Sequence, residues 1–595
     1  MVTGSTRHPA ARFGSGGSGR PASSAVRCCP RQSAVAVTVA VTSVGSLLLS
    51  LVAPQQIERS RHCATSSDGP AALLAPLDRL LCEGGDERLA IPVSSERNVY
   101  GCCPRPRPEV IALSSCTATS ISLRAYKHAR EVQELLIGDL STQGAFAAFE
   151  PTMEQMRRSL RAHLALEHSG VEVIFSPSGT DSQLHALFFA ALSLGSPITS
   201  IVVGSDQTGS GTPLTARARH FSSRTARGKA VAKGTDIAGW RAPPNSIDIH
   251  FVTPDGTIRS TAEMDRLVTS AVSAEIGKGR KVVLQAMNAS KFGWRAPSDA
   301  CLAAISDAWP EAVQVVIDAC QMRISRVQLG GYLSRRYLVM ITGSKFMSGP
   351  PFSGALLVPK RLSDELAELT TTAPDGLFEY ADRSDLPLSW HGLRNSLVLQ
   401  PNFGQWLRWE AALEEMRAYY RLPASYRRGV IDALAAAIPK QIQASAHLEP
   451  YPSPCSLEPT ADAAEEFGAP TIFPFLIRSA DGYLDLSQAG ELWRDLNRHL
   501  HELHRSPDDD ASALPVRPCH LGQPVTVRLR DGKAAAALRI AIGSRNLVEC
   551  WSNRTNAIGT AVESILADVV TAIRRTDLAV SGRNPRDGRP FKHAA

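Results

Sequence analysis

The sequence predicts an α/β protein with a large domain built on a mostly parallel sheet, followed by a smaller α+β domain. Six short apolar runs lie between positions 171 and 342, and helical stretches separate several of them. Strands buried on both faces have this composition, and parallel strands need crossover connections, so the alternation predicts a parallel sheet. The six predicted strands span residues 171–175, 198–203, 249–252, 282–286, 313–317 and 338–342.

The chain before this core has a different composition. Of the 595 residues, the first 33 are rich in Gly, Ser, Pro and Arg, which predicts disorder because little apolar surface is available for burial. Residues 34–53 carry no charge and follow Arg27 and Arg31, a pattern typical of a signal or anchor segment. An unstructured extension and an upstream start codon are the alternatives. We therefore assign residues 1–105 to a low-complexity or disordered N-terminal extension.

The large domain, with an N-terminal arm, is predicted over residues 106–400. Residues 151–168 place Met153, Leu160 and Leu164 close to helical spacing, and the polar remainder predicts one exposed face. Further helices are predicted between the strands. They span residues 184–194, 261–278 and 296–309.

The small α+β domain is predicted over residues 401–578. A long helix at 402–420 marks the change from sheet core to helix, and two later runs have strand composition. The strands are predicted at 471–477 and 536–542, and a helix at 557–574 closes the domain. Residues 579–595 are rich in Gly, Pro and Arg, which predicts a loose tail.

Charge and cysteine content exclude some classes of function. The chain has 64 basic and 57 acidic residues, and this small imbalance of +7 predicts no nucleic-acid partner. Its twelve cysteines form no CxxC motif and no Cys/His set at zinc spacing, so no metal site is predicted. The simplest interpretation is that the cysteines are unpaired thiols in a reducing compartment.

A phosphate site is predicted at Ser178-Gly-Thr-Asp-Ser182. This segment follows a predicted strand and precedes an apolar helical run. Free backbone N–H groups and the helix dipole attract anions at such a junction, and Gly179 permits close approach, with Ser178 and Thr180 beside it. Taken alone, the motif is better explained by an ordinary strand-to-helix turn with a Ser/Thr/Asp cap.

Two polar residues follow the predicted strand at 313–317. Asp318 ends this apolar strand, an unfavourable position for a carboxylate unless a positive charge meets it. Gln321 lies three residues further on and offers an amide donor. The alternative for Asp318 is a cap of the next element at the carboxyl edge of the sheet.

A lysine follows the next strand. Lys345 comes 27 residues after Asp318, one helix and one strand onward, in a core with few lysines. Thr342 and Ser344 offer hydroxyl donors beside it. An exposed loop lysine is the common alternative.

Together these segments supply what a pyridoxal 5′-phosphate (PLP) cofactor needs. Its phosphate, protonatable ring nitrogen, phenolate oxygen and aldehyde each require a different protein group. Asp318 suits the ring nitrogen and Gln321 the phenolate, while Thr342 and Ser344 suit the phosphate. Lys345 suits the aldehyde, because a lysine held out of bulk water near a cationic cofactor has the lowered pKa that Schiff-base formation requires.

The order of these segments resembles class V aminotransferases and cysteine desulfurases, within the PLP-dependent fold type I superfamily. The resemblance extends to Ser290-Lys-Phe-Gly293, which is similar to an S-N-x-x-G segment of those enzymes. His520-Leu-Gly-Gln-Pro524 and Arg539 are similar to the desulfurase H-C-A-Q-P loop and its carboxylate-binding arginine. It covers about residues 106–574 and implies a seven-stranded sheet, bound PLP with Ser290 among its contacts, a homodimer and a cytoplasmic enzyme.

Two departures from the family limit the reaction. Leu521 stands where the desulfurase has its nucleophilic cysteine, so desulfuration through that loop is not expected, with Cys519 and Cys455 as the remaining thiols to consider. Thr208 stands where the family has a histidine over the cofactor ring. Gln207 and His220 are the other residues predicted to approach the ring.

Three functions remain open at the level of sequence. The first is an aminotransferase-like enzyme acting on an amino acid or related primary amine through a Schiff base at Lys345, with Arg539 holding the substrate carboxylate. The second is another PLP reaction, by a lyase, decarboxylase or desulfurase. The third is a non-catalytic protein that keeps the fold. Side chains around 114–120 and 390–395 are too generic to name a substrate.

Overall fold

The computed structural model describes most of the chain from residue 70 onward. The described residues all belong to one compact unit, and residues 1–65 lie outside the described part. The apolar run at 34–53 and Cys455 also lie outside it. Among the described helices, none has the length and apolar composition needed to cross a bilayer. The described residues are 70–93, 95–143, 145–240, 242–369, 373–452, 466–498, 517–553 and 556–581.

A seven-stranded sheet forms the centre of the large domain, as predicted. Its strand order is β2-β8-β7-β6-β5-β3-β4. Only β8 runs antiparallel, to both of its neighbours, so the mostly parallel α/β architecture is confirmed. The strands are β2 (Glu172–Ser176), β3 (Ile198–Val203), β4 (Asn245–Ile249), β5 (Lys281–Met287), β6 (Val313–Asp318), β7 (Leu338–Thr342) and β8 (Gly354–Val358).

Two of these strands differ from the sequence prediction. The run predicted at 249–252 is wrong as a strand, because β4 ends at Ile249. β4 is an edge strand whose Asn245, Ser246 and Asp248 are polar, so it has no apolar run to reveal it. β8 was not predicted, since it follows a loop rich in Gly and Pro.

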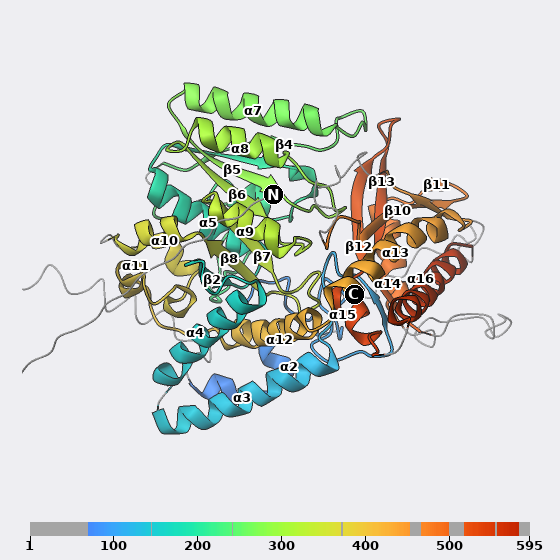
Figure 1. Cartoon of the computed structure of the whole chain (residues 1–595), viewed down its shortest axis with the longest axis horizontal. Coiled ribbons are helices and arrows are strands. Elements are labelled where there is room, and N and C mark those ends of the chain that lie inside the picture. Colours follow the sequence, from blue (N-terminus) through green and yellow to red (C-terminus); the bar gives the residue numbers. More distant parts are fainter. Residues whose placement is uncertain are drawn as a thin grey trace, which may run out of the picture. The chain divides into compact units, whose positions relative to one another are not determined.

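Helices cover both faces of this sheet. Along β5, Val282 and Leu284 join the apolar cluster that contains α7 and α8, while Val283 joins the cluster that contains α5. This alternation is the two-residue period of a strand. Figure 1 shows α7 and α8 lying together along one side of the sheet. The helices are α5 (Gly179–Leu194), α7 (Thr261–Gly277), α8 (Asp299–Ala308), α9 (Arg326–Ser334), α10 (Lys360–Ala367) and α11 (His391–Ser396).

The second sheet belongs to the smaller α+β part of the chain. Its order is β1-β12-β13-β10-β11, with β9 also paired to β10. β1 (Ile111–Leu113) comes from the N-terminal arm and pairs in parallel with β12 (Cys519–Arg528). The arm predicted with the large domain therefore contributes a strand to the small one. The other strands are β9 (Leu448–Pro450), β10 (Ile472–Ser479), β11 (Gly482–Tyr483) and β13 (Ala534–Ala541).

Four helices accompany the second sheet. α13 (Ala424–Gln443) packs against α16 (Ala557–Ser581), and α14 (Leu486–Leu496) packs against β12. Figure 1 shows α13 and α16 beside these strands. α15 is the short helix Ser544–Glu549. α16 continues through residue 581, so the loose tail predicted from 579 begins no earlier than 582, outside the described residues.

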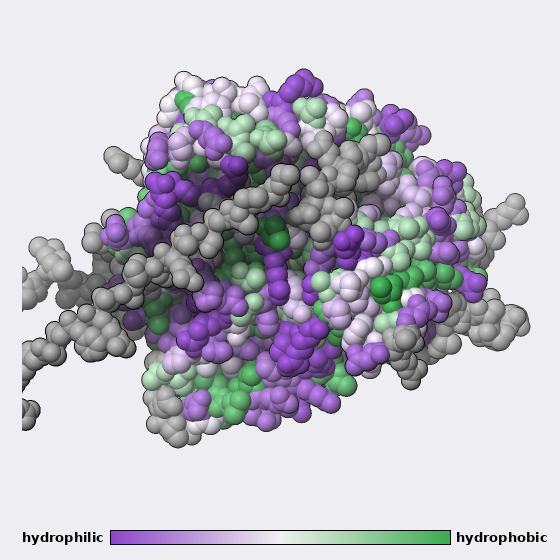
Figure 2. Space-filling model, in the orientation of Figure 1, coloured by the Kyte–Doolittle hydropathy of each residue, from purple (hydrophilic) through white to green (hydrophobic). Residues whose placement is uncertain are grey.

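A bundle of three long helices adjoins the large sheet. α12 (Phe403–Tyr420) confirms the helix predicted at 402–420 and packs against α3 (Leu123–Gln143) and α4 (Ala145–His163). α4 ends at His163, five residues before the predicted end at 168. Figure 2 shows hydrophobic residues gathered near α3, whose Leu123 and Leu135 are exposed.

Residues 70–105 correct the predicted extension. They form the 3₁₀ helix η1 (Pro70–Leu74) and the helix α2 (Leu77–Leu80), with Leu73 and Leu77 buried in the main core. The Arg408 guanidinium of α12 donates hydrogen bonds to carbonyl oxygens of this segment. The prediction failed because this leucine-rich stretch is short and was grouped with the low-complexity residues that precede it.

Short elements complete the described chain. They are η2 (Ser205–Gln207), α6 (Thr212–Thr215), η3 (Asp375–Glu379) and η4 (Arg383–Asp385). The eight described cysteines are all free thiols.

Candidate functional site

Most of the predicted site residues lie at one edge of the seven-stranded sheet. β7, β6, β5 and β3 are neighbours and run in parallel, so their carboxyl ends share an edge. Lys345, Asp318, Ser290 and Thr208 end or follow these four strands in turn. β2 runs parallel to β7, because both pair antiparallel with β8, and Ser178 therefore joins the same edge. Open α/β sheets bind ligands at this edge.

Lys345 lies in a tightly packed turn after β7. A Cβ added to Gly343 would lie 2.5 Å from the Ala412 Cβ of α12, so only glycine fits there. Lys345 is itself partly buried, and within the described chain its amine makes no hydrogen bond and no ion pair within 4.0 Å. The turn holds an amine without a partner at the carboxyl edge.

The first turn of α5 contains the residues predicted to bind an anion. Ser178 is its N-cap and exchanges hydrogen bonds with Asp181. A Cβ on Gly179 would lie 2.6 Å from the Cys320 Sγ, so the helix start packs directly on the segment after β6. Burial and the neighbouring Asp86 raise the pKa of the Asp181 carboxyl to about 7.

Arg88 is a residue of this site that the sequence reasoning missed. Its Nη1 and Nη2 lie 3.5 Å from the Thr180 Oγ1 and the Ser178 Oγ. Asp86 holds the same guanidinium in a bidentate ion pair. The signal was present in the charged run Asp86-Glu-Arg88, but that run was assigned to the extension. A cation thus stands beside the N-terminus of α5, where both attract anions.

Asp318 ends β6 beside the Lys345 turn. Its Oδ1 accepts a hydrogen bond of 3.1 Å from the Cys320 backbone N–H, and no ion pair within 4.0 Å reaches it from the described residues. Burial and the Asp318 charge raise the pKa of the Cys320 thiol well above its ordinary value. Asp318 therefore offers one oxygen to a cationic partner, while Cys320 is a protonated thiol.

Gln321 and Thr342 lie at this edge with their polar groups largely engaged. The Gln321 amide donates to the Cys116 carbonyl at 3.0 Å, and its oxygen accepts from Arg323 at 2.8 Å. The Thr342 hydroxyl donates to the Cys320 carbonyl at 2.6 Å. In this arrangement Thr342 has no hydrogen left for a phosphate, and Gln321 has at most one for a phenolate. The buried Ser344 hydroxyl makes no hydrogen bond to the described residues, so it remains available.

Ser290 stabilises the turn after β5 instead of facing a ligand. Its hydroxyl accepts hydrogen bonds of 3.1 Å from the backbone N–H groups of Phe292 and Trp294, and it donates to Gln207. Gly293 closes the same turn at a φ of +85°, which favours glycine. The turn carries Lys291, a second residue that the sequence reasoning missed.

Three residues were predicted to lie near the cofactor ring. Thr208 is buried and donates to the Ser205 carbonyl at 3.1 Å. The neighbouring Gln207 keeps its buried Nε2 without a partner among the described residues. His220 is engaged elsewhere, because its Nδ1 lies 2.7 Å from the Tyr380 hydroxyl. Gln207 is thus a better candidate than His220 for a ligand contact.

Arg539 of β13 reaches this edge from the second sheet. It is 2% exposed, which excludes the alternative of a solvated surface arginine. Its guanidinium donates to the Thr117 hydroxyl at 3.0 Å, to the Lys291 carbonyl at 3.3 Å and to the Gln523 carbonyl. Its Nε is buried without a partner in the described chain, and no carboxylate lies within 4.0 Å. Burial lowers the pKa of Arg539.

Positions near the desulfurase-like segment are structural. Leu521 is 1% exposed and pairs with Leu113 across the β12–β1 ladder. Burial raises the pKa of the Cys519 thiol to about 12, so it is not a nucleophile at neutral pH. The His520 Nε2 donates a hydrogen bond of 2.9 Å to the Tyr100 carbonyl, and its Nδ1 lies 3.1 Å from the Ser114 hydroxyl. Burial lowers the pKa of His520 to about 4.

The polar residues of segments 114–120 and 390–395 differ in what they contact. Thr117 contacts Arg539 and belongs to the site. Thr119 donates to the Ser348 carbonyl, Trp390 donates to Ser363, and Arg394 pairs with Glu150, so these three hold the fold together.

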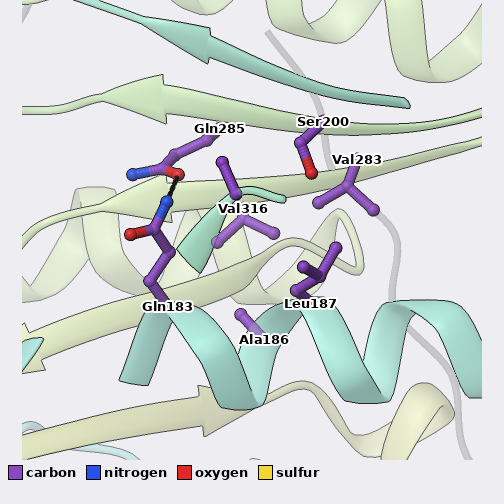
Figure 3. A pocket seen from close by; sticks show the side chains of 8 residues that line it. Gln183, Ala186, Leu187, Ser200, Val283, Gln285 and Val316 are labelled. Atoms are coloured by element: carbon purple, nitrogen blue, oxygen red, sulfur yellow. Dashed lines mark hydrogen bonds between the residues drawn. The ribbon is translucent and has the colours of Figure 1, made fainter. Parts of the chain in front are cut away.

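Two hollows of the described chain lie away from this site. Figure 3 shows a space of about 10 Å³ between α5 and the sheet, where the Gln183 amide donates to the Gln285 oxygen. That volume suits at most one water molecule. A second hollow, of about 560 Å³, lies along α7 and α8 and contains none of the predicted site residues.

Comparison with known proteins gave matches only among solved structures, because no family model and no curated sequence matches the chain. Cysteine desulfurase CsdA from Escherichia coli is 13% identical, with a TM-score of 0.46 over 79% of this chain and 96% of that one. A structure of SPT with a PLP internal aldimine is 11% identical, with a TM-score of 0.41 over 78% and 87%.

A third match is the glutamate decarboxylase domain of a Vibrio parahaemolyticus transaminase and decarboxylase, 13% identical with a TM-score of 0.42 over 78% of this chain and 80% of that one.

Proposed function

We propose that the protein is a PLP-dependent enzyme that acts on an amino acid or related primary amine, with aminotransferase-like chemistry. The observation that supports this most is the partnerless Lys345 amine at the carboxyl edge, beside an Asp318 carboxylate that also lacks an ion pair within the described chain. A lysine that binds an aldehyde must be free of such partners.

The residues present fit the cofactor. Arg88 and the first turn of α5 would hold the phosphate, with the Ser344 hydroxyl as a further donor. Asp318 would pair with the ring nitrogen, and Lys345 would hold the aldehyde. The group supplies an electron sink for a carbanion at the substrate Cα.

Further roles belong to the chain's own side chains. Arg539 and Thr117 would bind the substrate carboxylate, since the guanidinium is buried, fixed by three hydrogen bonds and free of any carboxylate among the described residues. Lys345 would carry a proton to and from the substrate Cα through its Nζ. Thr208 and Gln207 would cover the ring face without aromatic stacking.

The alternative reactions are a lyase, decarboxylase or desulfurase, and a non-catalytic protein is the third possibility. The buried Leu521 and the protonated Cys519 count against desulfuration, because neither provides a thiolate. Thr208 provides no aromatic ring to stack on the cofactor, so the experiment must also distinguish a non-catalytic protein.

Spectroscopy of the purified protein tests the proposal. We expect the absorbance band of lysine-bound PLP, its loss in Lys345→Ala, and its retention in the control Lys281→Ala at the opposite end of β5. Transfer of an amino group to 2-oxoglutarate would then support transamination, whereas release of carbon dioxide or sulfide would support the alternatives. A protein that binds no PLP would refute the proposal.

A homodimer and a cytoplasmic location also form part of the proposal, from the family resemblance. The exposed Leu123 and Leu135 of α3 are apolar side chains that a second copy would cover. Light scattering measures the mass in solution. N-terminal sequencing of the native protein shows whether residues 34–53 are retained.

A further inference from the structure

Three cationic side chains converge at the proposed site. Lys345 follows β7, Lys291 follows β5, and Arg539 enters from β13. Arg539 is joined to the Lys291 main chain by a hydrogen bond of 3.3 Å to its carbonyl oxygen. Burial, then the charges of Arg539 and Lys345, lower the pKa of the Lys291 amine to about 8, against the opposing effect of the Asp206 charge. The Lys291 amine therefore lies within electrostatic reach of both other cations.

These cations form no ion pair in the described chain, because no carboxylate of the described residues lies within 4.0 Å of Lys291, Lys345 or Arg539. Asp206 attracts the Lys291 amine from further away, and its carboxylate accepts hydrogen bonds from the backbone N–H groups of Phe251 and Val252.

Buried arginines elsewhere in the described chain are fully engaged: Arg157 pairs with Glu154, and Arg323 donates five hydrogen bonds to surrounding oxygens. The Lys291 and Lys345 amines, by contrast, have no hydrogen-bond or ion-pair partner among the described residues. Because unpaired charge away from water is costly, the two amines indicate that anions enter this site from outside.

The number of cations exceeds what the proposed roles use. Lys345 is assigned to the aldehyde and Arg539 to the substrate carboxylate, which leaves Lys291 without a role. The Ser290 hydrogen bonds and Gly293 fix the turn that carries it. A lysine is a point charge that suits a carboxylate or a phosphate equally.

We propose that Lys291 binds a second acidic group of the substrate, so that the preferred amine is dianionic, with Arg539 on its α-carboxylate. This inference rests on the proposed function and names its substrate class. The second group is a carboxylate or a phosphate at the far end of the substrate. Lys291 is thus a specificity-determining residue that the S-N-x-x-G resemblance does not account for.

Calorimetric titration at neutral pH tests this on the full chain. The probes are butyrate, with one acidic group, and glutarate and 4-phosphonobutyrate, with two. We expect glutarate or the phosphonate to bind at least about tenfold more tightly than butyrate, the effect of one charge-assisted contact. Lys291→Met should remove that advantage and leave butyrate affinity within about twofold, as one contact is lost. Lys281→Met should change neither.

Equal binding of butyrate and both dianions by the wild-type protein would overturn the inference. So would an equal loss for butyrate and glutarate in Lys291→Met, because that result indicates a general structural effect. The PLP absorbance band, measured on the same preparation, separates this outcome from failure of the proposed function. A missing band with a retained dianion preference would refute PLP binding alone, and a band without the preference would refute the role of Lys291 alone.

Discussion

The Arg88 Nη1 lies 3.5 Å from the Thr180 Oγ1, although 92 positions separate the two residues. The segment before the predicted core thus reaches the first turn of α5. Asp86 fixes the guanidinium there, and the rings of Phe221 and Phe352 lie 5.6 Å and 5.3 Å from it. The N-terminal segment therefore contributes a charged side chain to the site as well as apolar ones to the core.

Arg88→Met should weaken PLP binding by about tenfold to a hundredfold, because a charge-assisted contact to the phosphate is worth about 1.5–3 kcal/mol. Equilibrium titration of the cofactor-free protein with PLP measures the change. Arg88→Lys should recover part of the loss by keeping the charge. Arg79→Met, which removes an exposed ion pair with Glu83, is the control. An unchanged PLP affinity in Arg88→Met would remove Arg88 from the site.

The pKa of Lys291 predicts a pH-dependent stability. Its value of about 8 in the folded protein lies below the ordinary 10.5, so folding disfavours the charged amine. The penalty is complete below pH 8 and disappears as the pH rises through 10.5. Lys291→Met should therefore raise the free energy of unfolding at pH 7 by about 3 kcal/mol. Urea unfolding of both proteins measures this gain, which should shrink steadily as the pH is raised.

Lys281→Met serves as the control for this series. Its amine is exposed and donates to the Glu311 carbonyl, so its removal should change the stability little at any pH. A gain in Lys291→Met that stays constant with pH would show that packing, and not charge, is responsible.

The sequence indicated the strands and the chemistry better than it indicated the contacts between distant segments. β6 and β7 are short, apolar and bounded by polar residues, and this pattern alone predicted Asp318 and Lys345 at the ends of neighbouring strands. Local composition decides such strands. The sequence did not reveal Arg88 and Lys291 as site residues, because their roles depend on contacts with distant segments. Arg88 contacts α5, and Lys291 contacts β13.

The same limit explains the residues whose assigned roles the contacts do not support. Ser290 and Thr342 are hydroxyl residues at the right edge, and both lie where the motifs placed them. The Ser290 hydroxyl donates to Gln207, and the Thr342 hydroxyl donates to the Cys320 carbonyl. Which acceptor each hydroxyl bonds depends on the side-chain geometry. A sequence shows which donors are near a site, but not which of them are already engaged.

Close packing at the start of α5 gives a further prediction. Gly179→Ala should lower the free energy of unfolding by about 1–3 kcal/mol, since the new Cβ would lie 2.6 Å from the Cys320 Sγ. Gly179→Ala combined with Cys320→Ala should recover most of the loss, as measured by a double-mutant cycle in urea. Gly330→Ala, in open space on α9, should be neutral or stabilising. Additive effects in the cycle would contradict direct contact between the two positions.

Restoring the desulfurase cysteine should not restore desulfuration. Leu521 lies within β12, paired with Leu113 and almost fully buried, so a thiol in its place would be held in the sheet. Burial raises the pKa of a thiol, as it does for Cys519 in the same strand, and suppresses the thiolate. Leu521→Cys should therefore release no sulfide from cysteine and should react with a thiol reagent only after unfolding. Leu123→Cys, on the exposed face of α3, should react at once in the folded protein. Rapid labelling of Leu521→Cys in the native state would show that this strand opens and that the thiol has access to solvent.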